Sequence, residues 1–335
     1  MKGYQITQFG IGNLRSVDLE LPRPGRRDVL VRIRATSLNY RDLMMIEGTY
    51  NPKLKFPLVP FSDGAGEVAE IGSEVTRWKV GDRVCPIFMQ GWVDGELDYA
   101  KFKTTLGGDL DGCLREFGAF HEDGLVRIPD GLSFEEAACL PCAGVTAWTA
   151  LMGSVAVKKD ETVLLQGTGG VSTFALQFAK LAGARVIITS SSNKKLERAK
   201  SLGADEVINY REHEDWDEVV LGLTNKRGVD HVVEVGGAGT LSRSMRAVKM
   251  AGHIAVIGVV AGKGEISHVP IFMKALRVIG VFVGSCEMFE NMNAAIERSG
   301  IKPVVDRTFA FDEVRNALGY MESGAHFGKV VITME

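Results

Sequence analysis

The sequence contains no long apolar run and no cluster of basic residues. No apolar stretch approaches about 18 residues, so the sequence predicts no transmembrane helix. The first ten residues, MKGYQITQFG, lack the apolar core of a signal peptide. Lys and Arg number 39 against 42 Asp and Glu, which gives a net charge of −3. This balance argues against a nucleic-acid or membrane-surface partner.

Cysteine is scarce, and its distribution bears on the compartment of the protein. The five cysteines are scattered and odd in number: Cys85, Cys113, Cys139, Cys142 and Cys286. This pattern fits a reducing cytoplasm better than a disulfide framework. The 335 residues suffice for two domains with substantial cores, and 45% hydrophobic with 24% charged residues is ordinary for a soluble globular protein.

The stretch 161–193 predicts a strand, a glycine turn, a helix and a second strand. An apolar, β-branched run at 162–165 precedes the glycine turn at 167–170, and residues 171–181 carry apolar side chains at helical spacing. A second β-branched run follows at 186–189. Together these elements form a βαβ unit with parallel strands, which predicts a doubly wound Rossmann sheet.

The glycine turn is typical of a dinucleotide site. Gly167, Gly169 and Gly170 permit a tight turn and a close approach to a pyrophosphate, and the helix that begins near Val171 offers free N–H groups to that anion. Ser172 stands where the motif has its third glycine, and we expect a slightly wider approach there. The alternative is a plain α/β turn without a nucleotide.

The end of the second strand distinguishes between two cofactors. NAD sites usually place Asp or Glu there, to accept a hydrogen bond from the ribose 2′-hydroxyl. Residues 190–195 instead read SSSNKK, with Ser190 and Lys194 suited to a 2′-phosphate. We therefore predict NADP(H) rather than NAD(H), although Lys194 and Lys195 would also suit a solvated helix.

Further strands are predicted at 207–210, 229–235, 253–259 and 278–283, and Gly258 lies at the ligand-binding end of its strand.

Six motifs, one of them the glycine turn described above, carry a family resemblance. They are Asn39-Tyr40-Arg41-Asp42, Gly64-Ala65-Gly66-Glu67-Val68, Gly81-Asp82-Arg83-Val84, Cys142-Ala143-Gly144-Val145-Thr146-Ala147, the turn at 167 and Leu202-Gly203-Ala204-Asp205. Over nearly its whole length the chain resembles the medium-chain dehydrogenase/reductase superfamily. The resemblance implies a GroES-like, partly open β-barrel catalytic domain at 1–128 and 283–335, with a Rossmann domain at 129–282.

The resemblance also implies roles for individual residues. Thr146 is expected beside the nicotinamide, and Tyr210 near the adenine or the 2′-phosphate. Lys329 is expected either at the cofactor phosphates or as a plain surface lysine. The strand at 278–283 often pairs across a dimer in this superfamily, so a homodimer is expected.

The positions that hold catalytic zinc in related alcohol dehydrogenases are altered. Asn39 and Ser62 replace the first two ligands, and only the third position matches, as Cys142. Catalytic zinc requires three N, S or carboxylate ligands, so we predict a metal-free site. The lobe that binds structural zinc is missing too. Cys139 and Cys142 share metal-like spacing, but their apolar surroundings favour packed small residues.

Without a metal to polarise a carbonyl, the easiest hydride acceptors are already electrophilic. We therefore predict an NADPH-dependent reductase of quinones or α,β-unsaturated carbonyl compounds, similar to quinone oxidoreductases and enoyl reductases. Tyr40 is a candidate proton donor or a packed wall residue, Asn39 a hydrogen-bond donor to substrate or ribose, and Asp42 a structural group paired with a cation. Alternatives are a metal-free alcohol dehydrogenase or carbonyl reductase, and a non-enzymatic NADPH-binding sensor.

Overall fold

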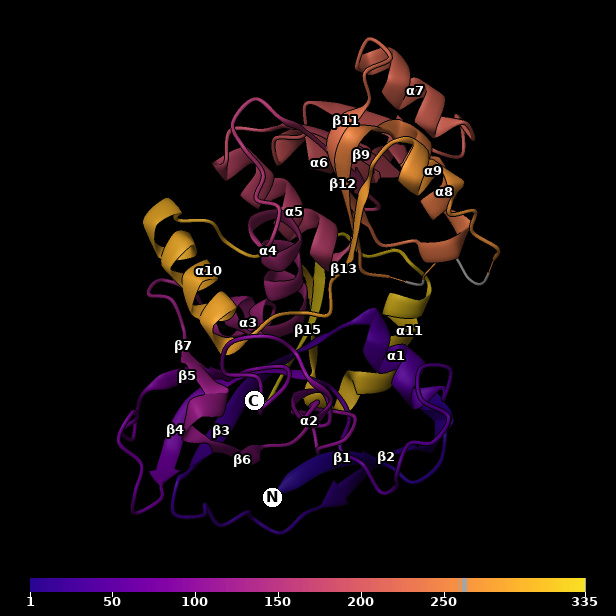
Figure 1. The fold of residues 1–335 in the computed structure, drawn as a ribbon. Coiled ribbons are helices and arrows are strands. Elements are labelled where there is room, and N and C mark those ends of the chain that lie inside the picture. Colours follow the sequence, from indigo (N-terminus) through magenta and orange to yellow (C-terminus); the bar gives the residue numbers. More distant parts are fainter. Residues whose placement is uncertain (259, 261–263, 335) are drawn as a thin grey trace. The chain divides into compact units, whose positions relative to one another are not determined.

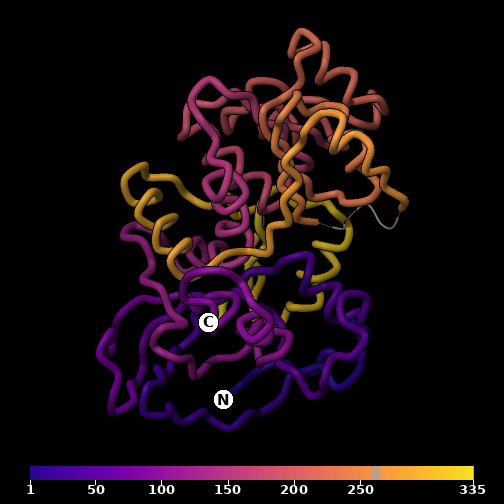
Figure 2. Tube along the Cα trace, in the orientation of Figure 1, coloured from indigo at the N-terminus to yellow at the C-terminus, as the bar shows by residue number. Residues whose placement is uncertain are grey.

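The computed structural model describes residues 1–258, 260 and 264–334. The chain divides into two compact units, one of Met1–Val145 with Gly284–Glu335 and one of Thr146–Val283. The C-terminal segment returns to pair with N-terminal strands of the first unit, as the yellow and indigo segments show (Figures 1 and 2). Within the described residues, no helix is long and apolar enough to cross a membrane.

The first unit is built on a seven-stranded sheet. Its strands run in the order β14-β15-β3-β4-β5-β7, with β6 paired to β3, and β1 and β2 form a separate ribbon. The strands are β1 (Lys2–Ile6), β2 (Leu14–Asp18), β3 (Asp28–Leu38), β4 (Asp63–Ile71), β5 (Arg83–Pro86), β6 (Phe117–His121), β7 (Leu125–Arg127), β14 (Val305–Ala310) and β15 (Lys329–Thr333). The helices are α1 (Tyr40–Ile46), α2 (Tyr99–Phe102), α3 (Phe134–Ala137), α10 (Cys286–Ser299) and α11 (Val314–Glu322).

The first unit extends further along the chain than the expected boundary at 128. Helix α3 packs on β3, β4 and β15, and the Ser37 hydroxyl donates to the Ala138 carbonyl at 2.7 Å. Ser133 and Glu136 form the capping box that the sequence indicates at the start of α3. Helix α3 ends at Ala137. A π-helical turn at Leu140–Gly144 follows and leads into α4 (Val145–Met152).

The second unit contains a six-stranded parallel sheet with the order β10-β9-β8-β11-β12-β13. Its strands are β8 (Thr162–Gln166), β9 (Arg185–Ser190), β10 (Glu206–Asn209), β11 (Val229–Glu234), β12 (Val248–Val256) and β13 (Arg277–Gly280). The expected end of the fifth strand at Val259 lies outside the described residues. The strand order reverses between β8 and β11, which confirms the predicted Rossmann topology.

Helices cover both faces of this parallel sheet. They are α5 (Gly170–Leu181), α6 (Asn193–Ser201), α7 (Trp216–Leu223), α8 (Leu241–Ala247) and α9 (Val269–Met273). Helices α5 and α6 pack on β8, β9 and β10, whereas Leu164 and Val232 pack with Trp216 of α7 and Met245 of α8. All five residues of β8 are buried, as expected of a central strand covered on both faces.

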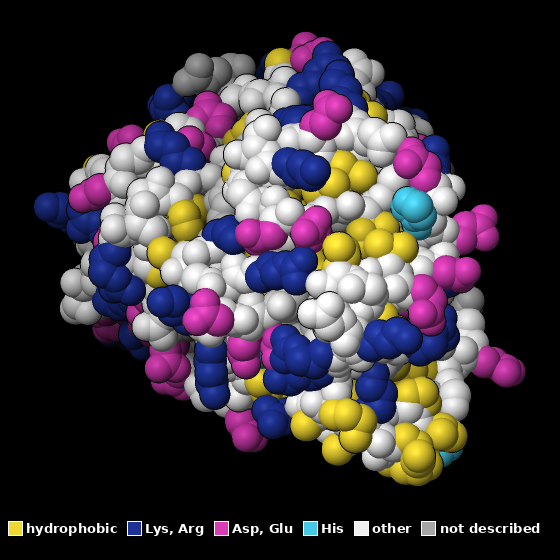
Figure 3. Space-filling model, turned by 90° about the horizontal axis from the view of Figure 1, so that it is seen from above, with side chains coloured by type: hydrophobic (Ala, Val, Ile, Leu, Met, Phe, Trp, Pro, Cys, Tyr) yellow, Lys and Arg dark blue, Asp and Glu magenta, His cyan; other side chains and the backbone are white. Residues whose placement is uncertain are grey.

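Charges of both signs are mixed over the surface seen in Figure 3. Basic and acidic side chains alternate across that face, and hydrophobic side chains gather at its lower end. The face therefore carries no extended field of one sign that would steer a polyanion.

Candidate active site

A buried polar cluster lies where β15 pairs with β3. Lys329 begins β15, is only 2% exposed, and donates from Nζ to the Leu38 carbonyl and to Asn39 Oδ1, each at 2.6 Å. The antiparallel register places Val330 opposite Leu38, which brings Lys329 to the residue that precedes α1. The interpretation of Lys329 as a plain surface lysine is therefore wrong. Its contact with cofactor phosphates stays a prediction.

Asp63 completes the cluster from the first position of β4. This fully buried carboxylate accepts hydrogen bonds from Ser62 Oγ at 2.8 Å and from the Cys142 backbone N–H at 3.2 Å. Lys329 Nζ lies 3.9 Å from Asp63 Oδ2. Removal of one partner of a buried ion pair typically costs about 3–5 kcal/mol, so Lys329 and Asp63 depend on each other.

Asp42 fixes the start of α1. Its carboxylate accepts from the backbone N–H of Asn39 at 2.8 Å and of Ser62 at 3.3 Å, and Arg41 Nη1 lies 3.6 Å away. The expectation of a structural, cation-paired Asp42 is therefore confirmed. Burial raises the pKa of Asp42 to about 6, although Arg41 opposes the rise. Asp42 thus holds the two residues that stand in the first two zinc-ligand positions.

The residues at the three zinc-ligand positions do not suit Zn²⁺. The only oxygen that the Asn39 side chain could offer a metal already accepts from the Lys329 ammonium. Burial and the nearby Asp63 carboxylate raise the pKa of the Cys142 thiol, whereas zinc binds the thiolate. Across the described ranges, no three His, Cys, Asp or Glu side chains are arranged to hold a metal ion. All five cysteines are unpaired.

Two tyrosines lie near α1 in different surroundings. Tyr40 opens the helix and is 43% exposed, and Tyr50 is 38% exposed. The Tyr50 ring centroid lies 5.8 Å from the Arg41 guanidinium, which also lies 4.6 Å from the Phe88 ring centroid. Burial raises the pKa of the Tyr50 phenol, Arg41 lowers it, and Cys142 is close enough to raise it further. Sequence reasoning missed Tyr50, although Gly48-Thr49-Tyr50 marked a turn beside the site.

In the second unit, the glycine turn has the geometry of a dinucleotide loop. Gly167 has a φ of +70°, and Gly169 caps α5, whose helix begins at Gly170 and continues through Val171. The first N–H groups of a helix have no intrahelical partner, so they are available to an anion. Ser172, in place of the third glycine, is buried and donates to the Gln166 carbonyl at 2.6 Å. The serine thus ties the helix to β8.

The predicted 2′-phosphate residues surround the end of β9. Ser190 is buried, with its hydroxyl 3.5 Å from that of Thr168, whereas Lys194 on α6 is exposed. Tyr210 is 41% exposed, and its backbone N–H donates to the Ser190 carbonyl at 3.1 Å. The structure therefore brings Thr168, Ser190 and Tyr210 together at the carboxyl edge of the sheet.

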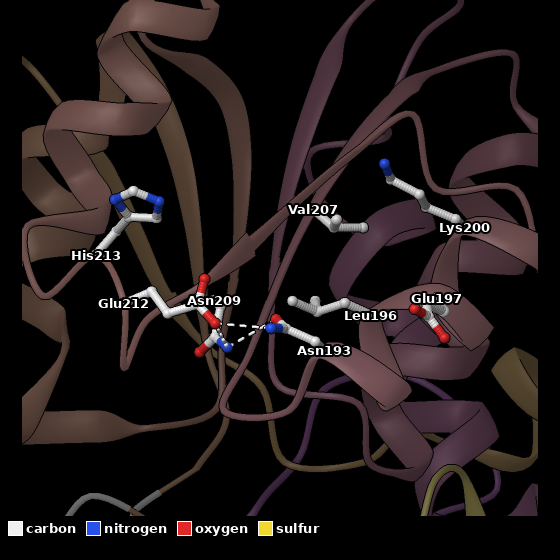
Figure 4. A pocket seen from close by; sticks show the side chains of 8 residues that line it. All are labelled: Asn193, Leu196, Glu197, Lys200, Val207, Asn209, Glu212 and His213. Carbon is white, nitrogen blue, oxygen red and sulfur yellow. Dashed lines mark hydrogen bonds between the residues drawn. The ribbon is translucent and has the colours of Figure 1, made fainter.

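A hollow beside this edge contains a carboxylate that sequence reasoning missed. Glu212 Oε1 accepts from Asn193 Nδ2 at 2.7 Å and from Asn209 Nδ2 at 2.9 Å, so the three side chains point toward one another (Figure 4). The lining residues are Asn193, Leu196, Glu197, Lys200, Val207, Asn209, Glu212 and His213. None of the predicted cofactor residues lines it.

Glu234 and Gly258 shape the neighbouring strand ends. The buried Glu234 carboxylate accepts from Gln166 Nε2 at 2.7 Å and from the Gly236 and Gly237 N–H groups at 2.9 and 3.0 Å. A Cβ on Gly258 would lie 2.0 Å from the Val235 carbonyl oxygen, so only glycine fits. Both features position the backbone at the point where the strand order reverses. Thr146, the first residue of this unit, is buried near the start of α4.

This combination of a GroES-like sheet and a Rossmann sheet defines a nicotinamide-dependent oxidoreductase fold. Residues 25–130 match the alcohol dehydrogenase GroES-like domain family, and residues 170–298 match the zinc-binding dehydrogenase family. The chain belongs to the medium-chain dehydrogenase/reductase superfamily, whose members bind nicotinamide cofactors. It is an oxidoreductase that acts on a small molecule.

Three relatives illustrate the range of the superfamily around this chain. A zinc-type alcohol dehydrogenase-like protein of Schizosaccharomyces pombe is 44% identical, over 97% of this chain and 96% of its own. A quinone oxidoreductase of Pseudomonas aeruginosa is 32% identical, over 90% and 89%. The crystal structure of an NAD-dependent alcohol dehydrogenase superposes with a TM-score of 0.91 at 32% identity, covering all of both chains.

Proposed function

We propose that the protein is a zinc-independent, NADPH-dependent reductase of quinones or other α,β-unsaturated carbonyl compounds. The observation that carries the proposal is the Lys329 ammonium bonded to Asn39 Oδ1 at the first zinc-ligand position. A metal at this position would compete with a buried cation for one oxygen. Without a Lewis acid, a substrate that is already electrophilic suits the site best, and one relative is itself a quinone oxidoreductase.

The residues near the reacting atoms are proposed to orient the substrate and supply a proton. A bound nicotinamide supplies the hydride, and Thr146 is proposed to lie beside it. The Asn39 amide donates to the substrate carbonyl. A proton then reaches the product from Tyr40, Tyr50 or water. Tyr50 is included because its ring centroid lies 5.8 Å from the Arg41 guanidinium.

The choice of NADPH depends on the end of β9. Ser190, Lys194 and Tyr210 are proposed to receive the 2′-phosphate, with Gly258 beside the bound cofactor, whereas the enclosed Lys329 is not assigned to the phosphates. One feature favours NADH instead, because Glu212 would repel a phosphate that came close to it.

Five unpaired cysteines support a reducing compartment, and we propose the cytoplasm.

The test is cofactor calorimetry on protein whose metal content has been measured, followed by a substrate screen. We expect NADPH to bind at least about tenfold more tightly than NADH, no stoichiometric zinc, and turnover of quinones or enones. Stoichiometric zinc would overturn the metal-free site. Turnover of simple alcohols without turnover of enones would favour a metal-free alcohol dehydrogenase.

A further inference from the structure

The Asn39 side chain is held in one orientation. An ammonium group has only N–H donors, so the Asn39 atom that meets Lys329 Nζ at 2.6 Å must be the amide oxygen. The amide nitrogen then faces Ser62 Oγ, 3.5 Å away. This contact engages one of its two N–H groups at most, and the other has no acceptor among the residues that the structure describes.

The ammonium is enclosed and does not meet a substrate itself. Lys329 is 2% exposed, its Nζ donates to Leu38 O and Asn39 Oδ1, and the Asp63 carboxylate lies 3.9 Å away. A cation on the oxygen of an amide draws electron density away from the nitrogen, which makes the N–H groups stronger donors. The charge of Lys329 can therefore act on a substrate through the N–H groups of the Asn39 amide.

We infer that Lys329 is a positioning residue that fixes and polarises the Asn39 amide, so that its free N–H donates to the substrate carbonyl oxygen. The inference rests on the proposed function. When a hydride adds to the β-carbon of an enone, the C=C electron pair shifts and the carbonyl oxygen becomes an enolate oxygen, which a proton on the α-carbon later neutralises. The amide N–H stabilises that oxygen, as donors of an oxyanion hole do.

Four variants separate this role from a structural one. Asn39→Asp keeps the size of the side chain and an oxygen for Lys329 but removes the N–H donors. Asn39→Ala removes the whole amide, Lys329→Met removes the ammonium, and the fourth variant combines these last two. Steady-state kinetics would be measured with NADPH and a quinone or enone that the wild type reduces.

We expect Asn39→Asp to lower kcat about 100-fold, with KM within about threefold of the wild type, because the donor acts mainly in the transition state. Lys329→Met is expected to lower kcat about tenfold or more. In the background of Asn39→Ala, Lys329→Met is expected to change kcat by less than about twofold, since the ammonium acts through the amide.

Lys274→Met is the matched control. Lys274 in the second unit also donates from Nζ to backbone carbonyls, those of Met245 at 2.9 Å and Arg246 at 3.0 Å. Its removal is expected to lower thermal stability and leave kcat unchanged. Full activity of Asn39→Asp, or multiplicative losses in the double variant, would overturn the inference.

An infrared measurement gives a result that does not require turnover. The carbonyl stretching band of an enone bound with oxidised cofactor is expected at lower frequency in the wild type than in Asn39→Asp, and an equal frequency would contradict the role of the amide. This comparison stays decisive if Lys329→Met fails to fold. Absence of wild-type turnover with a shifted band would reject the proposed function and keep the amide contact.

Discussion

At the scale of single residues, the two tyrosines near α1 offer different routes for a proton. The Tyr50 ring centroid lies 5.8 Å from the Arg41 guanidinium, whereas Tyr40 stands at the start of the helix, and the two residues are similarly exposed, at 38% and 43%. A phenol is protonated at neutral pH in either place, and the feature that favours Tyr50 as the donor is the Arg41 guanidinium, whose positive charge stabilises the phenolate that remains after transfer.

Tyr50→Phe is expected to lower kcat about tenfold to 100-fold, because general acid catalysis typically contributes at least that factor. Tyr40→Phe is the matched control and is expected to change kcat by less than about threefold. Steady-state kinetics and solvent deuterium isotope effects would measure both. The reverse ranking would identify Tyr40 as the proton donor.

The buried polar cluster around Lys329 and Asn39 was predictable from the sequence only in part. Asn39 and Ser62 were recognised because they replace expected metal ligands, and a single sequence is enough for that comparison. The partner of Asn39 was not predictable, because Lys329 lies 290 residues away and only the pairing of β15 with β3 brings it near. Long-range register of this kind has no local signal in the sequence.

At the scale of elements, the β9–α6 connection is proposed to decide the cofactor. Lys194→Glu is expected to weaken NADPH binding at least about tenfold and to leave NADH binding within about threefold, because only the 2′-phosphate is repelled. Calorimetry with both cofactors measures the two affinities.

Lys200→Glu, further along the same helix and beside the hollow of Figure 4, is the control and is expected to affect neither cofactor. Equal losses for NADPH and NADH in Lys194→Glu would show that Lys194 does not read the 2′-phosphate.

A chain of hydrogen bonds runs from Glu161, the residue before β8, through His231 of β11 to His253 of β12. The Glu161 carboxylate can only accept, so His231 donates to it from Nε2 at 2.9 Å and keeps a lone pair on Nδ1. His253 then donates from Nδ1 at 3.3 Å, which leaves a lone pair on its buried Nε2. Burial lowers the pKa of His253 to about 4, and a proton on Nε2 would find no acceptor among the described residues.

His253 makes the stability of the folded protein depend on pH below 6.5. Below its ordinary pKa of 6.5, His253 is protonated in the unfolded chain and neutral in the folded protein. Unfolding therefore takes up a proton, and stability falls as the pH drops from 6.5 to about 4. His253→Asn is expected to be less stable at pH 7 and to lose less stability over this range, because it does not titrate.

Denaturant unfolding at several pH values between 7 and 4 measures the difference. Exposed His268 provides the control, since His268→Asn should retain the wild-type slope. An unchanged slope in His253→Asn would show that other groups set the acid sensitivity.

The elements themselves were largely predictable in the second unit and less so in the first. The β8–α5–β9 unit carries strong periodic signals, and its observed bounds match the expected ones within one or two residues. In the first unit the elements are shorter: α2 spans only Tyr99–Phe102, and β6 begins at Phe117 and ends at His121. Short elements there depend on tertiary contacts, such as Gly112 N–H to the Val59 carbonyl, that local sequence does not encode.

At the scale of the whole molecule, the proposed homodimer has a suitable edge in the second unit. Among the residues that the structure describes, strand β13 ends the sheet and pairs with β12 alone. Nearby on α9, Val269, Phe272 and Met273 are 45%, 63% and 63% exposed. An uncovered edge strand beside exposed apolar side chains favours association with a second copy.

Analytical ultracentrifugation is expected to show a dimer for the wild type and a monomer for the double variant Phe272→Asp/Met273→Asp, because buried unpaired carboxylates would destabilise the interface. Val80→Asp replaces another exposed apolar residue, in the first unit, and should remain dimeric. A monomeric wild type at micromolar concentration would contradict the proposed dimer.

The late position of Lys329 in the chain has a consequence for synthesis. Asn39, Asp42 and Asp63 leave the ribosome long before β15 does, so a nascent first unit lacks the cation that its buried carboxylate requires. Release of β15 supplies the charge and orients the amide in one event, so a chain truncated before this strand would lack a working site even where its cofactor unit had folded.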